Sequence, residues 1–185
     1  AHELDDEGWT ASEIKELKNH ESNGSWSNID RSEVPRDRRL VKLIWVYKVK
    51  RDGTLKSRLC VQGCSQVPGI DFDQTFCATM RATSLRLLAS IAAQRNLHMR
   101  RWDFVAAYLQ GELLENEVVY CHPPPGYETI GADGKQRVCR VERPVCGMAQ
   151  AGRRWQRCLF PWLKQYGLKQ SDADPSVFHT KVRRR

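Results

Sequence analysis

Two strand-forming runs joined by an Asp-Gly turn place the strongest constraint on how this 185-residue chain folds. Residues 40–50 and 55–62 are rich in Val, Ile, Leu and aromatic residues, and Arg51-Asp52-Gly53-Thr54 lies between them. Asp-Gly at this position favours a tight turn, because glycine readily adopts the positive φ that such a turn requires. We therefore predict an antiparallel hairpin that carries basic residues at its tip and along one strand.

Two segments repeat apolar residues at helical spacing. Residues 83–95 do so from Ser84 onward, and Ser84 is the predicted N-cap. Residues 150–166 place a row of large apolar side chains on one face. The members of this row are Trp155, Leu159 and Trp162. A third, shorter helix is predicted at residues 9–17, where Thr10 and Glu13 have the spacing of a capping box, and the polar residues 23–25 follow it.

A carboxylate follows another strand signal. Residues 97–102 alternate in polarity as a strand does, and Asp103 comes directly after them. An Asp in this place can equally be a helix N-cap or a solvated turn residue. Short strands are also predicted at 118–120 and 137–141. This order of elements indicates an α+β fold, an antiparallel sheet with helices packed on one side.

Length and composition favour a single domain. A chain of 185 residues with 41% hydrophobic content buries one ordinary core. It has no apolar run of about eighteen residues and begins with an acidic segment, so we expect no membrane span, no signal peptide and an intracellular location (cytoplasm or nucleus). The seven cysteines include one close pair, Cys60 and Cys64, which favours free thiols over a zinc site.

The net charge of +8 is unevenly distributed along the chain. Residues 1–30 carry −6, residues 31–130 carry +5 and residues 131–185 carry +9. A basic surface favours contact with a phosphate backbone, because each neutralised phosphate releases counterions. The alternative is a solvated basic face with no such partner.

Eight short blocks follow one another along the chain. They are residues 44–53, 56–66, 69–76, 101–111, 111–120, 124–127, 146–155 and 174–178. In this order they resemble the blocks of the copia-type retrotransposon reverse transcriptase. For example, Gly69-Ile70-Asp71-Phe72 matches the family's Gly-Ile-Asp-Tyr, and Pro124-Pro125-Gly126-Tyr127 matches its Pro-Pro-Gly-Phe.

The resemblance implies an RNA-directed DNA polymerase domain. It assigns residues 9–178 to the fingers and part of the palm, behind an acidic segment of residues 1–30 with its short helix and before a basic tail of residues 179–185. The implied partners are an RNA or DNA template-primer and a deoxynucleoside triphosphate, with Mg²⁺ or Mn²⁺ as the cofactor. The family also has a downstream palm and thumb, a ribonuclease H and an integrase.

The resemblance also assigns roles to individual residues. Asp103 would be the catalytic metal ligand, and the backbone carbonyl of Phe104 would contact the triphosphate-side ion. The implied nucleotide-binding residues are Lys50, Lys56, Arg58, Tyr108 and Gly147, and the implied nucleic-acid contacts are Arg153, Arg154 and Arg157. Two alternatives stay open: Tyr108 as a core aromatic, and the cations as an exposed basic strand edge. Asp172 and Asp174 fit a turn or helix-end role better than metal ligation.

Several positions depart from the family. Cys146-Gly147 stands where the family has Tyr-Gly, and Gly152 stands where it has Pro. The family's Tyr-x-Asp-Asp hairpin, which carries the other metal-binding carboxylates, does not occur before the sequence ends at Arg185. We therefore expect no polymerase activity from the isolated chain. A non-enzymatic, basic nucleic-acid-binding remnant is the alternative function, and an unfolded product of a decayed gene is a third.

Overall fold

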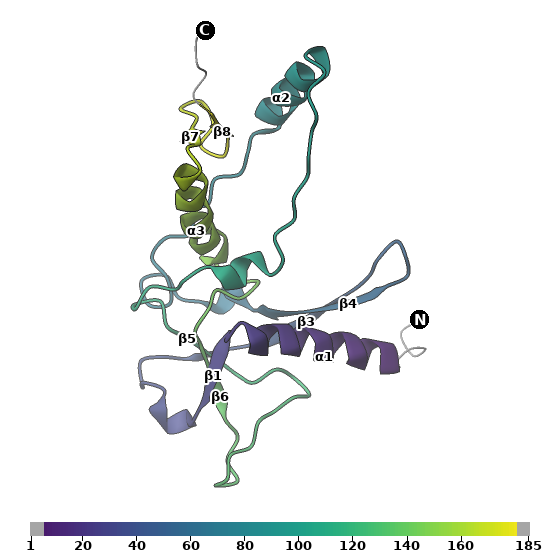
Figure 1. Cartoon of the computed structure of the whole chain (residues 1–185). Coiled ribbons are helices and arrows are strands. Elements are labelled where there is room, and N and C mark those ends of the chain that lie inside the picture. The colour runs from purple at the N-terminus through teal and green to yellow at the C-terminus, as the bar shows by residue number, and fades with distance from the viewer. Residues whose placement is uncertain (1–5, 181–185) are drawn as a thin grey trace.

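The predicted hairpin is present in the computed structural model, which describes residues 6–180 (Figure 1). β3 (Leu43–Val49) and β4 (Leu55–Val61) pair antiparallel from Leu43 opposite Val61 to Val49 opposite Leu55. Gly53 closes the turn at φ +80°. Most of the predicted basic tail, residues 179–185, lies outside the described residues.

The other elements are α1 (Asp6–Ser22), β1 (Trp26–Ile29), η1 (Arg31–Glu33), β2 (Leu40–Val41), η2 (Gly63–Ser65), α2 (Ala82–Gln94), η3 (Ala107–Gln110), β5 (Val119–Cys121), β6 (Val138–Val141), α3 (Ala151–Gln165), β7 (Lys169–Gln170) and β8 (Phe178–His179). The α+β class is confirmed. The predicted helices at residues 83–95 and 150–166 correspond to α2 and α3, and the predicted short strands correspond to β5 and β6. Among residues 6–180, none of the helices combines the length and the apolar character that crossing a membrane requires.

The main sheet has four strands in the order β1-β6-β5-β2. β2 and β5 pair parallel, whereas the other neighbours pair antiparallel, so the purely antiparallel sheet that we predicted is wrong. The predicted strand at residues 40–50 is bent at Lys42, whose carbonyl accepts a hydrogen bond from the Gln62 N–H at 2.9 Å. Its first part joins the main sheet and its second part forms the hairpin.

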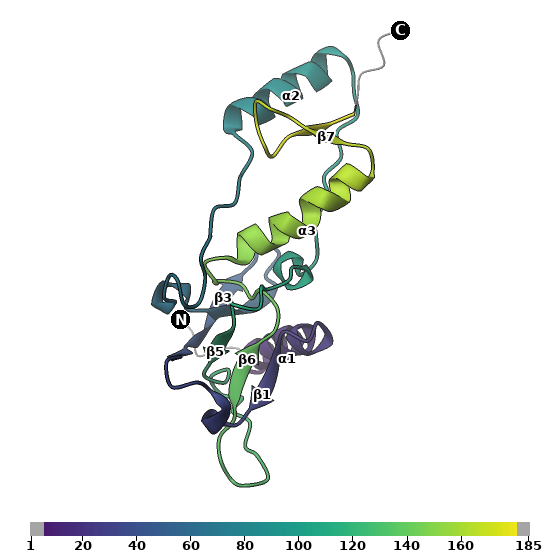
Figure 2. The ribbon, with the colours of Figure 1, turned by 90° about the vertical axis from the view of Figure 1, so that its left-hand side faces the viewer.

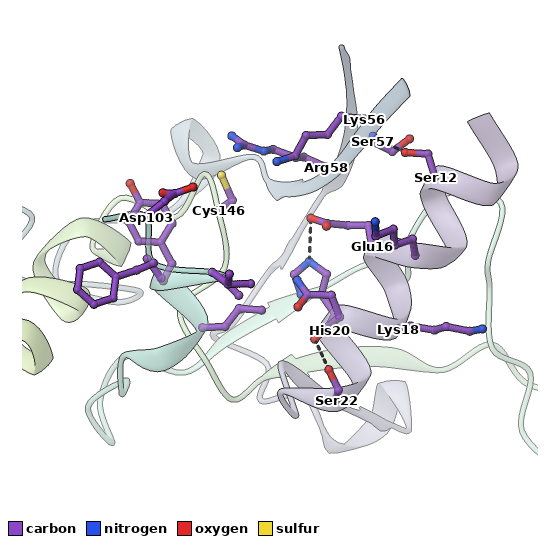
Figure 3. A pocket seen from close by; sticks show the side chains of 18 of the residues that line it. Ser12, Glu16, Lys18, His20, Ser22, Lys56, Ser57, Arg58, Asp103 and Cys146 are labelled. Atoms are coloured by element: carbon purple, nitrogen blue, oxygen red, sulfur yellow. Dashed lines mark hydrogen bonds and ion pairs between the residues drawn. The ribbon is translucent and has the colours of Figure 1, made fainter. Parts of the chain in front are cut away.

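Helix α1 lies along the free edge of β4 (Figures 1 and 3). The Ser57 N–H donates to the Ser12 hydroxyl at 2.7 Å, and that hydroxyl donates to the Leu55 carbonyl at 3.4 Å. The Leu59 N–H is bonded to the Glu16 carboxylate. Side chains of the helix therefore satisfy backbone groups that an edge strand otherwise leaves open.

The first helix is longer than we predicted. It begins at Asp6, so Thr10 lies inside it and the predicted capping box of Thr10 and Glu13 is wrong. It ends at Ser22, just before Gly24 adopts a positive φ of +58°, as the polar residues 23–25 indicated.

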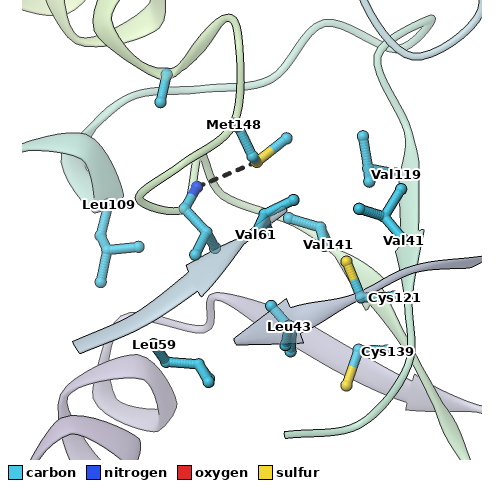
Figure 4. Packing of buried hydrophobic residues seen from close by; sticks show 12 residues of the cluster. Val41, Leu43, Leu59, Val61, Leu109, Val119, Cys121, Cys139, Val141 and Met148 are labelled. Carbon is cyan, nitrogen blue, oxygen red and sulfur yellow. Dashed lines mark hydrogen bonds between the residues drawn. The ribbon is translucent and has the colours of Figure 1, made fainter. Parts of the chain in front are cut away.

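One cluster of buried side chains joins the sheet, the hairpin and the start of α3 (Figure 4). Its members are Val41, Leu43, Leu59, Val61, Leu109, Val119, Cys121, Cys139, Val141, Val145, Met148 and Ala151. Full burial of one such Val or Leu stabilises a fold by roughly 1.5–3 kcal/mol. The hydrophobic effect therefore holds the hairpin against the sheet, and this cluster is the main core of the described residues.

Buried polar side chains connect three blocks that lie far apart in the sequence. The Gln66 amide donates to the Gln150 side-chain oxygen at 3.1 Å, and the Gln150 amide donates to the Asp71 carbonyl at 3.1 Å. Gln66 also accepts a hydrogen bond from the Ala149 N–H at 2.8 Å. Gln150 is fully buried, so each of these hydrogen bonds satisfies a group that water does not reach.

The structure divides into two regions, which we call the body and the arm (Figure 2). The body comprises residues 6–75 and 106–155 and contains the four-stranded sheet, the β3–β4 hairpin and the core. The arm comprises residues 76–105 and 156–180, with α2, most of α3 and the β7–β8 pair. In both views α2 lies apart from the four-stranded sheet and the hairpin on two extended connections, so the helices do not pack on one side of a sheet as predicted.

Two sequence-based expectations in the arm are wrong. Ser84 lies inside α2, and the N-cap is Arg81, whose N–H donates to the Asp174 carboxylate at 2.9 Å. Asp174 thus has the helix-end role that its position suggested. Residues 97–102 form no strand, and Leu97 and Met99 are 57% and 65% exposed, because no described segment pairs with them.

Candidate functional site

A cavity of about 930 Å³ opens between α1, β4 and the segment that leads into η3 (Figure 3). Six of the predicted site residues line it, although they come from two stretches some fifty residues apart in the sequence. They are Lys50, Lys56, Arg58, Asp103, Phe104 and Tyr108. The fold therefore brings the hairpin cations and the carboxylate to one place.

Strand geometry explains how the cations reach the cavity. Successive side chains of a strand point to opposite faces, so Lys56 and Arg58 of β4 share one face, while Ser57 and Leu59 face the other way and are buried. Lys50 lies at the base of the turn. With Lys15 and Lys18 of α1, five basic side chains line the cavity against two acidic ones, Glu16 and Asp103. This balance favours an anionic ligand.

Asp103 is exposed at the wall of the cavity and makes no hydrogen bond or ion pair with any residue from 6 to 180. Its neighbour Phe104 packs edge-on against Trp155 of α3, with ring centroids 5.1 Å apart. Ala106 then takes a left-handed conformation at φ +50°, which turns the chain into η3 and Tyr108. A left-handed non-glycine residue is uncommon, and such residues cluster at functional sites.

The cavity residues of α1 escaped prediction from the sequence. Ser12, Glu16 and His20 line the side opposite Asp103. Burial raises the pKa of Glu16, but contact with His20, the Leu59 N–H and the charge of Lys56 outweigh burial and lower it below the ordinary value. No local signal in the acidic segment pointed to this role, because it arises only when α1 packs beside β4.

The remaining predicted site residues lie elsewhere. Gly147 faces the backbone of β4: a Cβ there would meet the Val61 carbonyl at 2.2 Å, and φ is +90°. The cavity is instead lined by its neighbour Cys146. Glycine is therefore required at position 147 because the loop backbone approaches the β4 backbone closely. This requirement does not depend on contact with a nucleotide.

The three predicted nucleic-acid arginines differ in their surroundings. Arg153 donates to the Phe76 carbonyl at 3.1 Å. Arg154 is buried and forms an ion pair with buried Glu117, with Nη2 to Oε1 at 2.5 Å, so its guanidinium is not available to a phosphate. Arg157 is exposed on α3. Arg154 accordingly has a structural role, contrary to the expectation from the sequence.

The described residues do not by themselves fit a two-ion polymerase site. Two divalent ions require several carboxylate ligands, and residues 6–180 hold no group of three or more His, Cys, Asp or Glu that is able to bind a metal. The residues predicted to contact the metal, Asp103 and Phe104, both line the cavity. The cysteines among the described residues are all free thiols, as expected.

Comparison with known proteins places this chain in a family. Residues 25–183 match the model of the reverse transcriptase (RNA-dependent DNA polymerase) family. The chain is 32% identical over 89% of its length to the Retrovirus-related Pol polyprotein from transposon TNT 1-94 of Nicotiana tabacum, and 32% identical over 95% of its length to that from transposon RE1 of Arabidopsis thaliana. It is 28% identical over 80% of its length to the Transposon Ty1-BL Gag-Pol polyprotein of Saccharomyces cerevisiae.

The matched relatives are much longer proteins. The aligned region spans 12% of the two plant polyproteins and 8% of the yeast one. No solved structure is significantly similar to this chain.

Proposed function

The chain belongs to the reverse transcriptase (RNA-dependent DNA polymerase) family, in its copia-type branch, and we propose that it forms the part of the polymerase domain that binds the incoming deoxynucleoside triphosphate. In this proposal the β3–β4 hairpin belongs to the fingers, and the segment from Asp103 to η3 belongs to the palm. The bound nucleotide lies in the cavity between them.

One observation carries the proposal. Lys50, Lys56 and Arg58 line the same cavity as Asp103, although nothing in the local sequence requires the two groups to meet. Cations on one wall suit a triphosphate, because charge-assisted hydrogen bonds to phosphate are stronger than neutral ones. Asp103 on the facing segment suits the divalent ion that accompanies a triphosphate.

Each residue has a separate task in this scheme. The three cations neutralise phosphate oxygens, and Asp103 with the Phe104 carbonyl offers oxygen ligands to Mg²⁺ or Mn²⁺. Tyr108 is 39% exposed at the cavity wall, so it is available to contact the sugar. Because one carboxylate does not hold two ions, we expect weak metal binding and no primer extension by residues 1–185 alone. Template-dependent extension by this chain would contradict that expectation.

A nucleotide titration tests the proposal. Lys56→Ala should weaken binding of a fluorescent deoxynucleoside triphosphate about tenfold, since a hydrogen bond to a charged group contributes roughly 1.5–3 kcal/mol. Lys48→Ala is the matched control, because Lys48 is opposite Lys56 on the hairpin but does not line the cavity. Equal effects of the two substitutions, or no binding by the unaltered chain, would refute the proposal.

The alternative function, a basic nucleic-acid-binding remnant, has less support. Several arginines of the basic region 131–180 form ion pairs within the chain: Arg137 with Asp30 and Asp133, Arg140 with Glu142, and buried Arg154 with Glu117. Fewer free cations predict a shallow dependence of nucleic-acid affinity on salt. A steep dependence, unchanged by Asp103→Asn, would favour the alternative.

A further inference from the structure

Two cysteines meet beside the cavity. Cys60 follows Lys56 and Arg58 on the same face of β4, and Cys146 reaches the cavity wall from the loop before α3 (Figure 3). The Val61 N–H donates to the Cys146 carbonyl at 2.8 Å. Because Gly147 packs directly on the Val61 backbone, the loop is held firmly against the strand.

The two thiols contact each other through a side-chain hydrogen bond. The bond to Cys60 lowers the pKa of Cys146 to about 6, with help from the nearby Arg58 charge. The same bond, together with burial, raises the pKa of the Cys60 thiol. These directions favour Cys146 as the thiolate of the pair and Cys60 as its hydrogen-bond donor, and of the two only Cys146 lines the cavity.

No other cysteine pair of the described residues combines these properties. Cys121 and Cys139 face each other across β5 and β6, but both are buried in the core, and burial raises the pKa of both thiols. Cys64 and Cys158 are exposed, single thiols. Of these pairs, only Cys60 and Cys146 combine a half-buried partner, Cys60, with a thiol that lines the cavity, Cys146, and that a small molecule there can reach.

From this geometry we propose that Cys146 is a site of covalent modification by electrophiles and hydroperoxides, and that Cys60 is the resolving thiol that closes a disulfide with it. An electrophile such as iodoacetamide forms a bond from the Cys146 sulfur to its methylene carbon and releases iodide. A hydroperoxide is attacked at its O–O bond, which gives a sulfenic acid at Cys146 and releases water or an alcohol.

The second step uses Cys60. Its sulfur attacks the sulfenic sulfur, an S–S bond forms, and the hydroxyl leaves as water with the Cys60 proton. The two thiols lose two electrons in total, and the hydroperoxide gains them. The sulfurs move from hydrogen-bond contact to about 2 Å apart, a small shift that the loop and strand accommodate because their backbones are already joined.

The pH dependence of alkylation tests the thiolate. Between pH 7 and 8.5, the rate of iodoacetamide labelling at Cys146 should change by less than about 1.5-fold, whereas that of an unstructured cysteine peptide added as a reference should rise more than about tenfold, since an ordinary thiol has a pKa of about 8.5. Mass spectrometry measures the labelled Cys146 peptide and the labelled reference in one sample. Parallel profiles for Cys146 and the reference would overturn the assignment of a reactive thiolate.

Peroxide treatment tests the resolving thiol. One equivalent of hydrogen peroxide should give a Cys60–Cys146 disulfide that dithiothreitol reverses. In Cys60→Ser the sulfenic acid should persist and react with dimedone, while Cys64→Ser, an exposed cysteine from the same region, should still form the disulfide. Failure of the unaltered protein to form that disulfide would refute the pairing.

Protection by a nucleotide tests whether the thiol pair lies at the nucleotide site. Of the three experiments, this one alone rests on the proposed function. A deoxynucleoside triphosphate at saturation should slow labelling of Cys146 several-fold and leave Cys158 unchanged. If Cys146 reacts as described but the nucleotide gives no protection, the proposed nucleotide site fails and the thiol pair stands.

Discussion

The body and the arm both contain helices and strands with apolar side chains, yet the fraction of those side chains that is buried differs greatly between the two regions. Leu59 in the body is fully buried, whereas Leu87 in α2 is 62% exposed. No residue of α2 is buried, although the helix carries an apolar face. The body thus completes its own core, and the arm leaves a large apolar surface uncovered within the described residues.

This difference shows what an amphipathic pattern does and does not predict. Periodicity indicates that residues 83–95 form a helix and that one face of it favours an apolar environment. It does not say which surface covers that face. In α2, no described surface covers it, and the same holds for the extended residues 97–102 that follow.

The largest effect is expected from breaking the buried ion pair of the body. Arg154→Ala should lower the free energy of unfolding by about 3–5 kcal/mol, because it leaves the buried Glu117 carboxylate without its partner. Arg157→Ala, one turn further along α3 and exposed, should change it by less than about 0.5 kcal/mol. Urea denaturation of both variants measures the contrast, and equal stability would show that the pair contributes nothing to the body.

A matched pair of leucines tests the comparison directly. Leu59→Ala should lower the free energy of unfolding by about 2–5 kcal/mol, because it leaves a cavity in the core. Leu87→Ala should cost less than about 0.5 kcal/mol beyond helix propensity. A large loss from Leu87→Ala in thermal denaturation would break the comparison, since it would mean that α2 is covered in solution.

The smallest effect is local and concerns how the arm holds α2. The Ser84 side chain and the N–H groups of Arg81 and Ser176 lower the pKa of Asp174. The stability that the ionised Asp174 carboxylate adds to the arm is therefore fully present above the ordinary Asp pKa of about 3.9, and it is lost as the pH falls through the lower pKa of the folded state. Asp174→Asn should speed amide exchange at the start of α2 roughly threefold to tenfold at pH 7. Asp172→Asn, exposed and two residues away, should not change it.

Local patterns predicted much of the fold. Asp52-Gly53 located the hairpin, and the spacing of Trp155 and Leu159 located α3. The predictions failed where a residue distant in the sequence makes a contact that we had expected from a neighbouring residue. Asp174, some ninety residues from α2, accepts a hydrogen bond from the N–H of the N-cap residue Arg81, so this contact was not readable from the neighbouring sequence.

The candidate site was predictable in part for the same reason. The resemblance predicted that the hairpin cations and Asp103 belong to one site, and both line the cavity. The α1 wall of Glu16 and His20 was missed because α1 meets β4 only through tertiary packing. The structural role of Arg154 was missed because its partner, Glu117, lies thirty-seven residues away.

The helix beside β4 has a consequence for how a piece of this chain behaves on its own. The family match begins at residue 25, after α1 has ended at Ser22. A fragment cut at that boundary would keep every matched block but lose Ser12 and Glu16, which bond the Ser57 and Leu59 N–H groups. Its exposed strand would be a template for pairing between copies, and aggregation would follow. We therefore expect the acidic segment that precedes the family match to protect this strand from pairing between copies, in addition to lining the cavity.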